Sequence, residues 1–568
     1  AQDGAWDPEA ILAAQEWVRP PSAVVDAVLA PRYLNAALTE PGPAGRWFVH
    51  QVGDGPVPMN RFSRPFDELG GVFIDRTANR HRNLTNRSDV GITLISALDG
   101  SSVEVEVPEG ARISNATLSP DGSRVAFFAH FDDATYVYVA DSESGASRRI
   151  TDRPVLATLA QTFQWTSEGR EIATVLIPED RAPRPEAPSV PMGPQVKRTL
   201  EGENMLRTYA SLMATPHDEA LLEWHATGQL ALLDVESGAV ETVGAPDMIW
   251  GMDVAPDGGH ARVELLEKPF STIVPVNNFG RVEEIWDRSG TRLAEVARRE
   301  MNLGTDGNAP SAPGVGGQEE DPERREIQWF DGGAALAYLT AAQGDEEEED
   351  AEDEDRTDRV VVWSAPFGEN DETVVYAHDG PLEAYAFAPE HDLLFLREEE
   401  RDVEHQFAVE LDDPETVYTL YRHDTEEFYE DPGDLVLAEG SLVQGRRRTP
   451  QSGNAVVSED GRYAYLYGTE YATDPMETAP LNFLDRIEIR SGEKERVYAG
   501  QNQGTHEEMT GILDVDEESW VVTRQSPTQV PQYFRIQDGE RIQLTRNVDP
   551  TPDLTEAPRR RFTVTRPD

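Results

Sequence analysis

Few residues in this sequence combine the types and the spacing that known catalytic motifs require. A Gly-x-Ser-x-Gly turn, which exposes a serine nucleophile, occurs nowhere in the chain. His506 is followed by Glu507 and Glu508, but no second histidine completes a His-Glu-x-x-His zinc motif. A Walker loop and a dinucleotide fingerprint are also missing from the sequence. We therefore expect no catalytic, cofactor-binding or metal-ligating residues in this chain, and no cofactor.

The eleven histidines are scattered along the chain. His217 and His225 lie eight positions apart across an expected turn, while His130 and His260 follow expected strands. Each of them fits a local structural or surface role better than that of a ligand. Carboxylates are so frequent that no pair of them marks an acid–base site.

Two charged segments stand out. The segment 61–87 is rich in arginine, and 345–355 reads DEEEEDAEDED, ten carboxylates in eleven positions. The arginines either line a site for acidic groups or pair with nearby Asp and Glu, and we favour pairing. The acidic run lacks the glycine turn and the ordered spacing of an EF-hand, so we expect a solvated loop and no metal site. The arginines are Arg61, Arg64, Arg76, Arg80, Arg82 and Arg87.

Composition narrows the class of protein. The net charge is −56, and only Lys197, Lys268 and Lys494 are lysines. Such an excess of carboxylates is typical of adaptation to high salt, although an acidic secreted protein would also show it. It disfavours binding to nucleic acid or to anionic membranes. The absence of cysteine excludes disulfides, thiolate metal sites and cysteine catalysis.

The sequence also bears on location. No apolar run approaches the roughly 20 residues of a membrane span. The chain begins Ala1-Gln2 without an initiator methionine, as in a mature exported protein after removal of its signal peptide, or in an expressed fragment. We therefore expect no membrane span, and an exported protein that is periplasmic, cell-surface or extracellular.

The elements that would position any site are short strands. Residues 113–152 predict four antiparallel strands, with a Ser-Pro-Asp-Gly turn at 119–122 and a Ser-Gly turn at 144–145. Copies of the turn-and-strand half recur along the chain, and an outer strand–turn–strand half alternates with them. These copies begin at Phe163, Met252, Ile327, Tyr385 and Val456 for the first half, with a weaker one at Ala37, and at Leu230, Ile285, Ile487 and Phe534 for the second.

Repeated four-stranded units of this kind predict an all-β fold, a β-propeller of seven or eight four-stranded blades. A set of separate β-sandwich domains is the alternative. We assign 1–30 to an N-terminal segment with a short helix starting near Asp7, 31–550 to the propeller, and 551–568 to a linker with a new strand at Phe562–Thr565. The first and last copies are candidates to complete one blade together. Between blade strands, 178–194 is a proline-rich excursion, followed by a short helix at 205–213 and a strand at Leu221–His225.

Several stretches resemble the propeller of prolyl oligopeptidase family serine peptidases, in the branch labelled glutamyl endopeptidase-like. They are, in order along nearly the whole chain, 110–123 (GARISNATLSPDGS), 208–238 (TYASLMATPHDEALLEWHATGQLALLDVESG), 268–287 (KPFSTIVPVNNFGRVEEIWD), 526–534 (SPTQVPQYF) and 544–554 (LTRNVDPTPDL). In that family the propeller precedes an α/β-hydrolase domain with a Ser-Asp-His triad, against which an N-terminal helix typically packs. The resemblance implies that this domain would begin near 559–568, and no position here matches its nucleophile motif.

The resemblance therefore implies the substrate-gating propeller of a secreted serine peptidase, with the catalytic domain absent from this chain and the chain inactive alone. Its expected partners are an α/β-hydrolase domain, in cis or as a cleaved chain, and peptide substrates. The arginines of 61–87 would then be candidates to favour acidic side chains in the channel. The alternative is a stand-alone propeller that acts as a protein- or peptide-binding scaffold.

Overall fold

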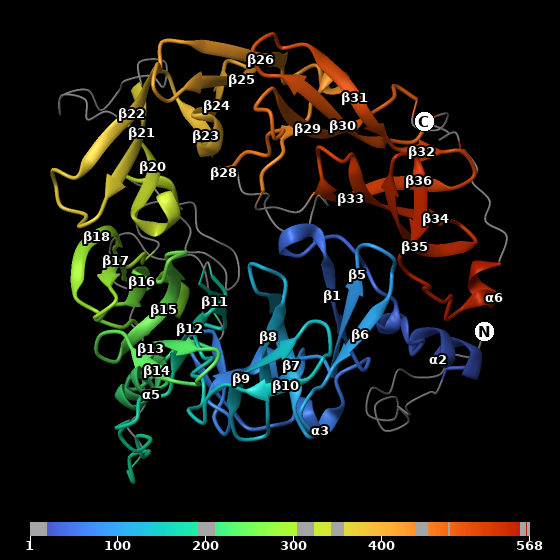
Figure 1. The fold of residues 1–568 in the computed structure, drawn as a ribbon. Helices are drawn as coiled ribbons and strands as arrows, with labels where there is room; N and C mark the ends of the chain where they lie inside the picture. The colour runs from blue at the N-terminus through green and yellow to red at the C-terminus, as the bar shows by residue number, and fades with distance from the viewer. Residues whose placement is uncertain are drawn as a thin grey trace, which may run out of the picture.

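Mainly antiparallel sheets follow one another around a ring in chain order (Figure 1). The computed structural model describes residues 20–166, 168–190, 209, 211–303, 323–341, 357–438, 442, 452–474, 478–556 and 564. Each sheet stands beside the next around a common centre, which is the architecture of a β-propeller. The predicted all-β propeller is thus confirmed, and its blade number stays a prediction.

The repeat predicted at 113–152 forms one sheet of four antiparallel strands, in the order β10-β9-β8-β7. Phe127 and Phe128 on β8 are both fully buried, although they point to opposite faces of the sheet. Phe127 packs in a cluster with the preceding sheet, and Phe128 in a cluster with the following one. Each sheet therefore buries its two faces against its two neighbours. The strands are β7 (Arg112–Leu118), β8 (Arg124–His130), β9 (Thr135–Asp141) and β10 (Ser147–Arg149).

The other predicted repeats also form strands. Going along the chain, they are β1 (Trp47–Val52), β5 (Gly91–Ser96), β6 (Ser102–Val105); β11 (Phe163–Trp165), β12 (Glu171–Leu176), β13 (Thr227–Asp234), β14 (Val240–Thr242); β15 (Asp247–Val254), β16 (His260–Leu266), β17 (Arg281–Asp287), β18 (Arg292–Arg299); β19 (Arg325–Phe330), β20 (Ala335–Ala341), β21 (Thr357–Ser364), β22 (Glu372–Asp379). They continue as β23 (Leu382–Ala388), β24 (Leu393–Glu400), β25 (Val403–Glu410), β26 (Val417–Asp424); β27 (Asp434–Leu435), β28 (Gly453–Asn454), β29 (Tyr463–Glu470), β30 (Leu481–Glu488), β31 (Lys494–Ala499); β32 (Gln501–Asn502), β33 (His506–Asp514), β34 (Ser519–Ser526), β35 (Gln529–Gln537), β36 (Glu540–Gln543).

The antiparallel order gives the ring two different rims. Short turns join the first strand of a sheet to the second, and the third to the fourth, so these turns share one rim, the turn rim. Connections between second and third strands lie on the opposite rim, the insertion rim. The longest of these connections, among the described residues, follow β1, β12 and β16. They contain α3 (Met59–Phe62), β2 (Phe66–Leu69), β3 (Val72–Asp75), β4 (Arg80–His81), α4 (Arg82–Asn86), α5 (Pro216–Ala226) and η3 (Val276–Asn278).

The strand predicted at Leu221–His225 is wrong, because these residues belong to helix α5. Thr215 caps the helix by accepting a hydrogen bond from the Asp218 backbone N–H, and the Asp218 carboxylate accepts one from the Thr215 N–H. Pro216 occupies the first helical position, where its missing N–H costs nothing. The capping signal was present in the sequence, and the repeat pattern obscured it. The neighbouring helix predicted at 205–213 falls mostly outside the described residues.

The ring closes without a shared sheet, contrary to the expectation that the first and last copies complete one blade. In the described chain, β1-β5-β6 and β32–β36 are separate sheets. Asparagine amides join them instead. The Asn547 amide donates to the Ala36 carbonyl (2.8 Å) and the Pro531 carbonyl (2.9 Å), and accepts from the Ala36 N–H (2.9 Å). The Asn35 amide pairs likewise with the N–H (3.0 Å) and the carbonyl (2.9 Å) of Val548.

Short helices flank this closure and the turns. Helix α2 (Ser22–Val28) lies in the predicted N-terminal segment, whereas the start expected near Asp7 and most of the strand expected at Phe562–Thr565 fall outside the described residues. Among the described residues, no helix has the length and apolar character needed to cross a membrane. The remaining short elements are η1 (Arg32–Leu34), η2 (Pro43–Gly45), η4 (Asp331–Gly333), η6 (Pro389–His391), η7 (Phe428–Glu430) and α6 (Pro552–Thr555).

Candidate functional site on the insertion rim

The insertions after β1, β12 and β16 pack together as a layer with its own apolar core. Backbone hydrogen bonds tie the first insertion to later parts of the chain: His81 N–H to the Ala157 carbonyl (2.7 Å), and Val276 N–H to the Gly70 carbonyl (2.9 Å). The layer is thus fixed to the ring at several points. Its core contains Leu69, Ile74, Leu222, Val274 and Phe279, together with other buried side chains from 69–279.

Most of the arginines in 61–87 are engaged with nearby groups, as the pairing interpretation predicted. Arg64 contacts the Asp75 carboxylate (3.1 Å) and the Asp132 carboxylate (2.5 Å). Arg61 lies 3.7 Å from Asp54, and Arg76 lies 3.8 Å from Asp67. Most of these ion pairs brace the insertion internally, and the Arg64–Asp132 pair also joins it to the connection between β8 and β9.

Arg80 and Arg82 are engaged in another way. Arg80 is only 4% exposed and donates to the Phe131 carbonyl (2.8 Å) and the Thr85 hydroxyl (2.9 Å). Burial lowers its pKa to about 10, against the opposing effect of Asp75. The Arg82 guanidinium lies 4.0 Å from the centre of the Phe66 ring. These contacts make the two arginines structural groups and leave no open anion site at either of them.

His225 lies in this layer beside a carboxylate. Its Nε2 lies 2.9 Å from Asp67, which also accepts from Arg184 at 2.9 Å. Burial raises the pKa of Asp67, but the bonds from His225 and Arg184 outweigh it and bring the pKa to about 2. The other ring nitrogen, Nδ1, is buried and has no partner among the described residues. An Asp–His pair lacks triad chemistry when no hydroxyl meets the second nitrogen.

Among the described residues, His130 forms the contact that most resembles the serine–histidine pair of a catalytic triad. Its Nε2 lies 2.8 Å from the Ser114 hydroxyl, but its Nδ1 meets the Thr135 hydroxyl (2.9 Å), where a triad would have a carboxylate. Burial, followed by the charges of Arg80 and Arg112, lowers the pKa of His130 well below 6.5. The imidazolium that general-base catalysis creates is therefore disfavoured here. The sequence placed these two residues 16 positions apart and gave no sign of their contact.

The other singled-out histidines also form no site. His260 packs against the Phe367 ring, with centroids 5.2 Å apart, and His506 pairs with Glu508 at 2.9 Å. His217 lies in the first turn of α5. Within the described part of the chain, no group of three or more His, Asp or Glu side chains is arranged to hold a metal ion. The acidic run 345–355 lies outside the described residues.

Exposed apolar side chains gather beside the ring closure. Helix α2 has no buried residue, and it lies near α6 (Figure 1). The Asn35–Val548 bonds and the Arg32–Thr551 contact (3.4 Å) bring the two chain segments together. We call this surface the closure patch. Its residues are Val24, Val28, Leu29, Leu34, Val548 and Leu554.

Comparison with known proteins gives relatives at low identity. No family model matches the chain. The probable chloroplastic glutamyl endopeptidases of Oryza sativa subsp. japonica and Arabidopsis thaliana are both 24% identical, over 530 and 541 residues. These alignments cover 88% of this chain, and 53% and 52% of the relatives. The chain therefore spans about half the length of the curated relatives it matches.

Solved structures give weaker matches. A structure from an analysis of two prolyl endopeptidases has 13% identity and a TM-score of 0.36, covering 93% of this chain and 58% of that one. The β-propeller domain of the Trilobed protease from Pyrococcus furiosus has 13% identity and a TM-score of 0.33, covering 78% and 98%. Together with the sequence motifs, the curated relatives support the resemblance to the prolyl oligopeptidase family, in its glutamyl endopeptidase-like branch, at low identity.

Proposed function

We propose that this chain is the substrate-gating β-propeller of a secreted serine peptidase, and that the nucleophile belongs to an α/β-hydrolase domain outside these residues. One observation carries the proposal: the chain is similar to probable glutamyl endopeptidases over 88% of its own length but over only about half of theirs. The chemistry of the described residues is consistent with it, because neither His130 nor His225 has the partners of a triad.

In this proposal the ring acts by exclusion. A ring placed over an active site admits extended peptides and rejects folded proteins, so selectivity comes from access and not from tighter binding. The closure patch is the surface we assign to the contact with the hydrolase domain, since its apolar side chains have no cover among the described residues. Most arginines of 61–87 are engaged with carboxylates, carbonyl groups or aromatic rings, so the proposal gives those arginines no role in selecting acidic substrates.

A serine-reactive fluorophosphonate probe tests the first half of the proposal. The purified chain should remain unlabelled, while a longer polypeptide of the source organism that contains this sequence should be labelled. The Ser114→Ala variant is the matched control, because Ser114 is the serine in contact with His130. Labelling of the isolated chain that Ser114→Ala abolishes would place the nucleophile in the ring and overturn the proposal.

The gating role needs a second measurement on the labelled, full-length species. It should cleave short peptides with glutamate before the scissile bond, and it should cleave a folded protein with the same site at least tenfold more slowly. Equal cleavage rates for the short peptide and the folded protein would contradict the gating role. If every polypeptide carrying this sequence has the mass of this chain and none reacts with the probe, the stand-alone scaffold is the correct function.

A further inference from the structure

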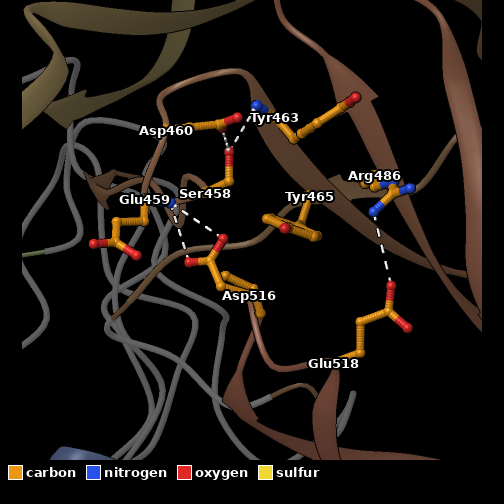
Figure 2. A pocket seen from close by; sticks show the side chains of 9 residues that line it. Ser458, Glu459, Asp460, Tyr463, Tyr465, Arg486, Asp516 and Glu518 are labelled. Carbon is orange, nitrogen blue, oxygen red and sulfur yellow. Dashed lines mark hydrogen bonds and ion pairs between the residues drawn. The ribbon is translucent and has the colours of Figure 1, made fainter. Parts of the chain in front are cut away.

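A cavity of about 500 Å³ opens on the turn rim between the sheet of β29–β31 and the sheet of β32–β36 (Figure 2). Its walls come from the turn before β29, from β29 and β30, and from the turn that joins β33 to β34. None of these residues belongs to the insertion rim or to the closure patch. The cavity is therefore a separate feature, and what it binds does not depend on the proposed peptidase function.

The turn between β33 and β34, which borders the cavity, differs from several other turns on this rim. At those junctions a glycine with a positive φ lets one turn lie close to the preceding one. A methyl group built on Gly169 (φ 63°) would lie 3.3 Å from the Ser119 Cβ, and one on Gly258 (φ 73°) would lie 3.2 Å from the Thr166 Cγ2. In the β33–β34 turn the left-handed position is Glu518 (φ 46°), so a side chain stands where the glycines leave room.

The walls are strongly acidic. The lining carboxylates are Glu459, Asp460, Asp516 and Glu518, and Arg486 is the one cationic side chain among the lining residues, which leaves a formal charge of −3. Arg486 is already engaged, because it bonds Glu495 (2.7 Å) and lies 3.7 Å from Glu518. The cavity therefore favours a cationic ligand. Acidic side chains are common on this protein, so their number alone does not define a site.

Tyr465 supplies the second observation. It is only 4% exposed, and it lines the cavity between Asp516 and Arg486 (Figure 2). Its hydroxyl makes no hydrogen bond to another described residue, and a tyrosine hydroxyl can both donate and accept one. Burial, with the charge of Asp516 adding to it, raises the pKa of Tyr465 to about 12, so the phenol stays neutral. Its oxygen is a free acceptor at the wall of an acidic cavity.

The shape of the cavity and the aromatic side chains that line it indicate which kind of cation it suits. In the described chain no three acidic groups converge as metal ligands, so a compact metal ion is a poor fit. A guanidinium group is flat, carries five N–H donors that suit carboxylates, and stacks on aromatic rings. Arg486 shows this mode within the cavity itself, with its guanidinium carbon 5.1 Å from the Tyr463 ring centre.

We propose that this cavity is a binding site for a guanidinium group, held by Asp516 and Glu518 and bonded to the Tyr465 oxygen. The same group is carried by free small molecules and by arginine side chains of polypeptides. Both sources present the same guanidinium group. They differ in that the arginine side chain is attached to a polypeptide backbone, whereas the small molecule is free. The experiment therefore includes both forms.

Calorimetric titration of the folded chain tests the proposal with three probes: agmatine, the peptide acetyl-Gly-Arg-Gly-amide, and the same peptide with citrulline in place of arginine. Citrulline has nearly the same shape but no charge. We expect saturable binding of agmatine or of the arginine peptide, with a Kd on the order of 1 mM, since the site offers one or two charged contacts. The citrulline peptide should bind at least tenfold more weakly.

Variants then assign the binding to the cavity. Tyr465→Phe removes only the hydroxyl and should raise the Kd severalfold, while Asp516→Asn combined with Glu518→Gln should raise it at least tenfold. Tyr136→Phe and Asp133→Asn make the same chemical changes outside the cavity and should leave the Kd unchanged. Thermal unfolding of each variant establishes that it is folded before titration.

The outcomes separate clearly. Binding of agmatine without the peptide identifies a small-molecule ligand, and preference for the peptide identifies a polypeptide ligand; either supports the site. Equal loss in Asp133→Asn and in the Asp516/Glu518 variant would show that the cation binds the acidic surface in general and would overturn the proposal. Equal affinity for the citrulline peptide, or no saturable binding by either cationic probe up to about 10 mM, would overturn it as well.

Discussion

Replacing Asn547 with alanine should open the ring at its closure. The side chain makes three hydrogen bonds, two to Ala36 and one to Pro531, at 2.8–2.9 Å. Each is worth about 1 kcal/mol net, and Ala36 is only 7% exposed, so its N–H and carbonyl cannot be fully rehydrated in the closed ring. We therefore expect the free energy of opening this junction to fall by about 2–4 kcal/mol.

Hydrogen exchange followed by mass spectrometry resolves where that change occurs. A loss of about 3 kcal/mol corresponds to roughly a hundredfold faster exchange of amides that exchange by opening of the junction. These amides lie in β1, β5 and β33–β36, on both sides of the closure. Amides in β19–β26, across the ring, should exchange at their original rates. Asn502→Ala removes an exposed asparagine from the same terminal sheet and should change neither group.

Two results would refute this reasoning. If Asn547→Ala and Asn502→Ala exchange alike, the asparagine contacts do not hold the ring closed. If exchange accelerates equally all around the ring, the closure is not a separate opening unit, and the sheets unfold together.

Other predictions follow from single residues and from the charge. Burial lowers the pKa of His130 in the folded state, so the unfolded chain takes up a proton at a higher pH than the folded chain does. The free energy of unfolding should therefore fall as the pH drops below about 6.5. The His130→Gln variant should show a shallower slope of unfolding free energy against pH. Asp67→Asn should cost about 3 kcal/mol in chemical unfolding, because it leaves Arg184 beside a neutral group and weakens the bond to His225. Gly169→Ala should lower Tm more than Gly539→Ala, since both have positive φ but only Gly169 contacts a neighbouring turn. We propose adaptation to high salt, so Tm should rise from 0.1 to 1 M KCl as the screening length falls from about 10 to 3 Å; a lower Tm at 1 M would contradict it.

The repeating core of the fold was predictable because its signals are local. Turn residues and alternating apolar strands at 113–152 predicted four strands, and four strands form between Arg112 and Arg149 with turns at the predicted positions. Helix α5 was also encoded locally, by Thr215, Pro216 and Asp218 at its start. That prediction failed because the expectation of another strand outweighed the capping residues.

The closure and the cavity were not predictable for a different reason. Both depend on contacts between residues far apart in the sequence, 511 positions for Ala36 and Asn547. Nothing in the local pattern around Asn35 or Asn547 distinguishes them from other loop asparagines. Glu518 shows the same limit: the missing glycine is visible in the sequence, but its consequence depends on the turn of the neighbouring sheet.

The two rims divide the functions that we assign to this ring. On the insertion rim, pairs such as Arg64–Asp75 and Arg184–Asp67 neutralise largely buried carboxylates and fix a covering layer. On the turn rim, the walls of the cavity keep an excess of three negative charges and an unpaired phenol. In a chain of net charge −56, carboxylates outnumber their cationic partners. The acidic side chains around Tyr465 therefore differ from the many others by the cavity and the phenol beside them.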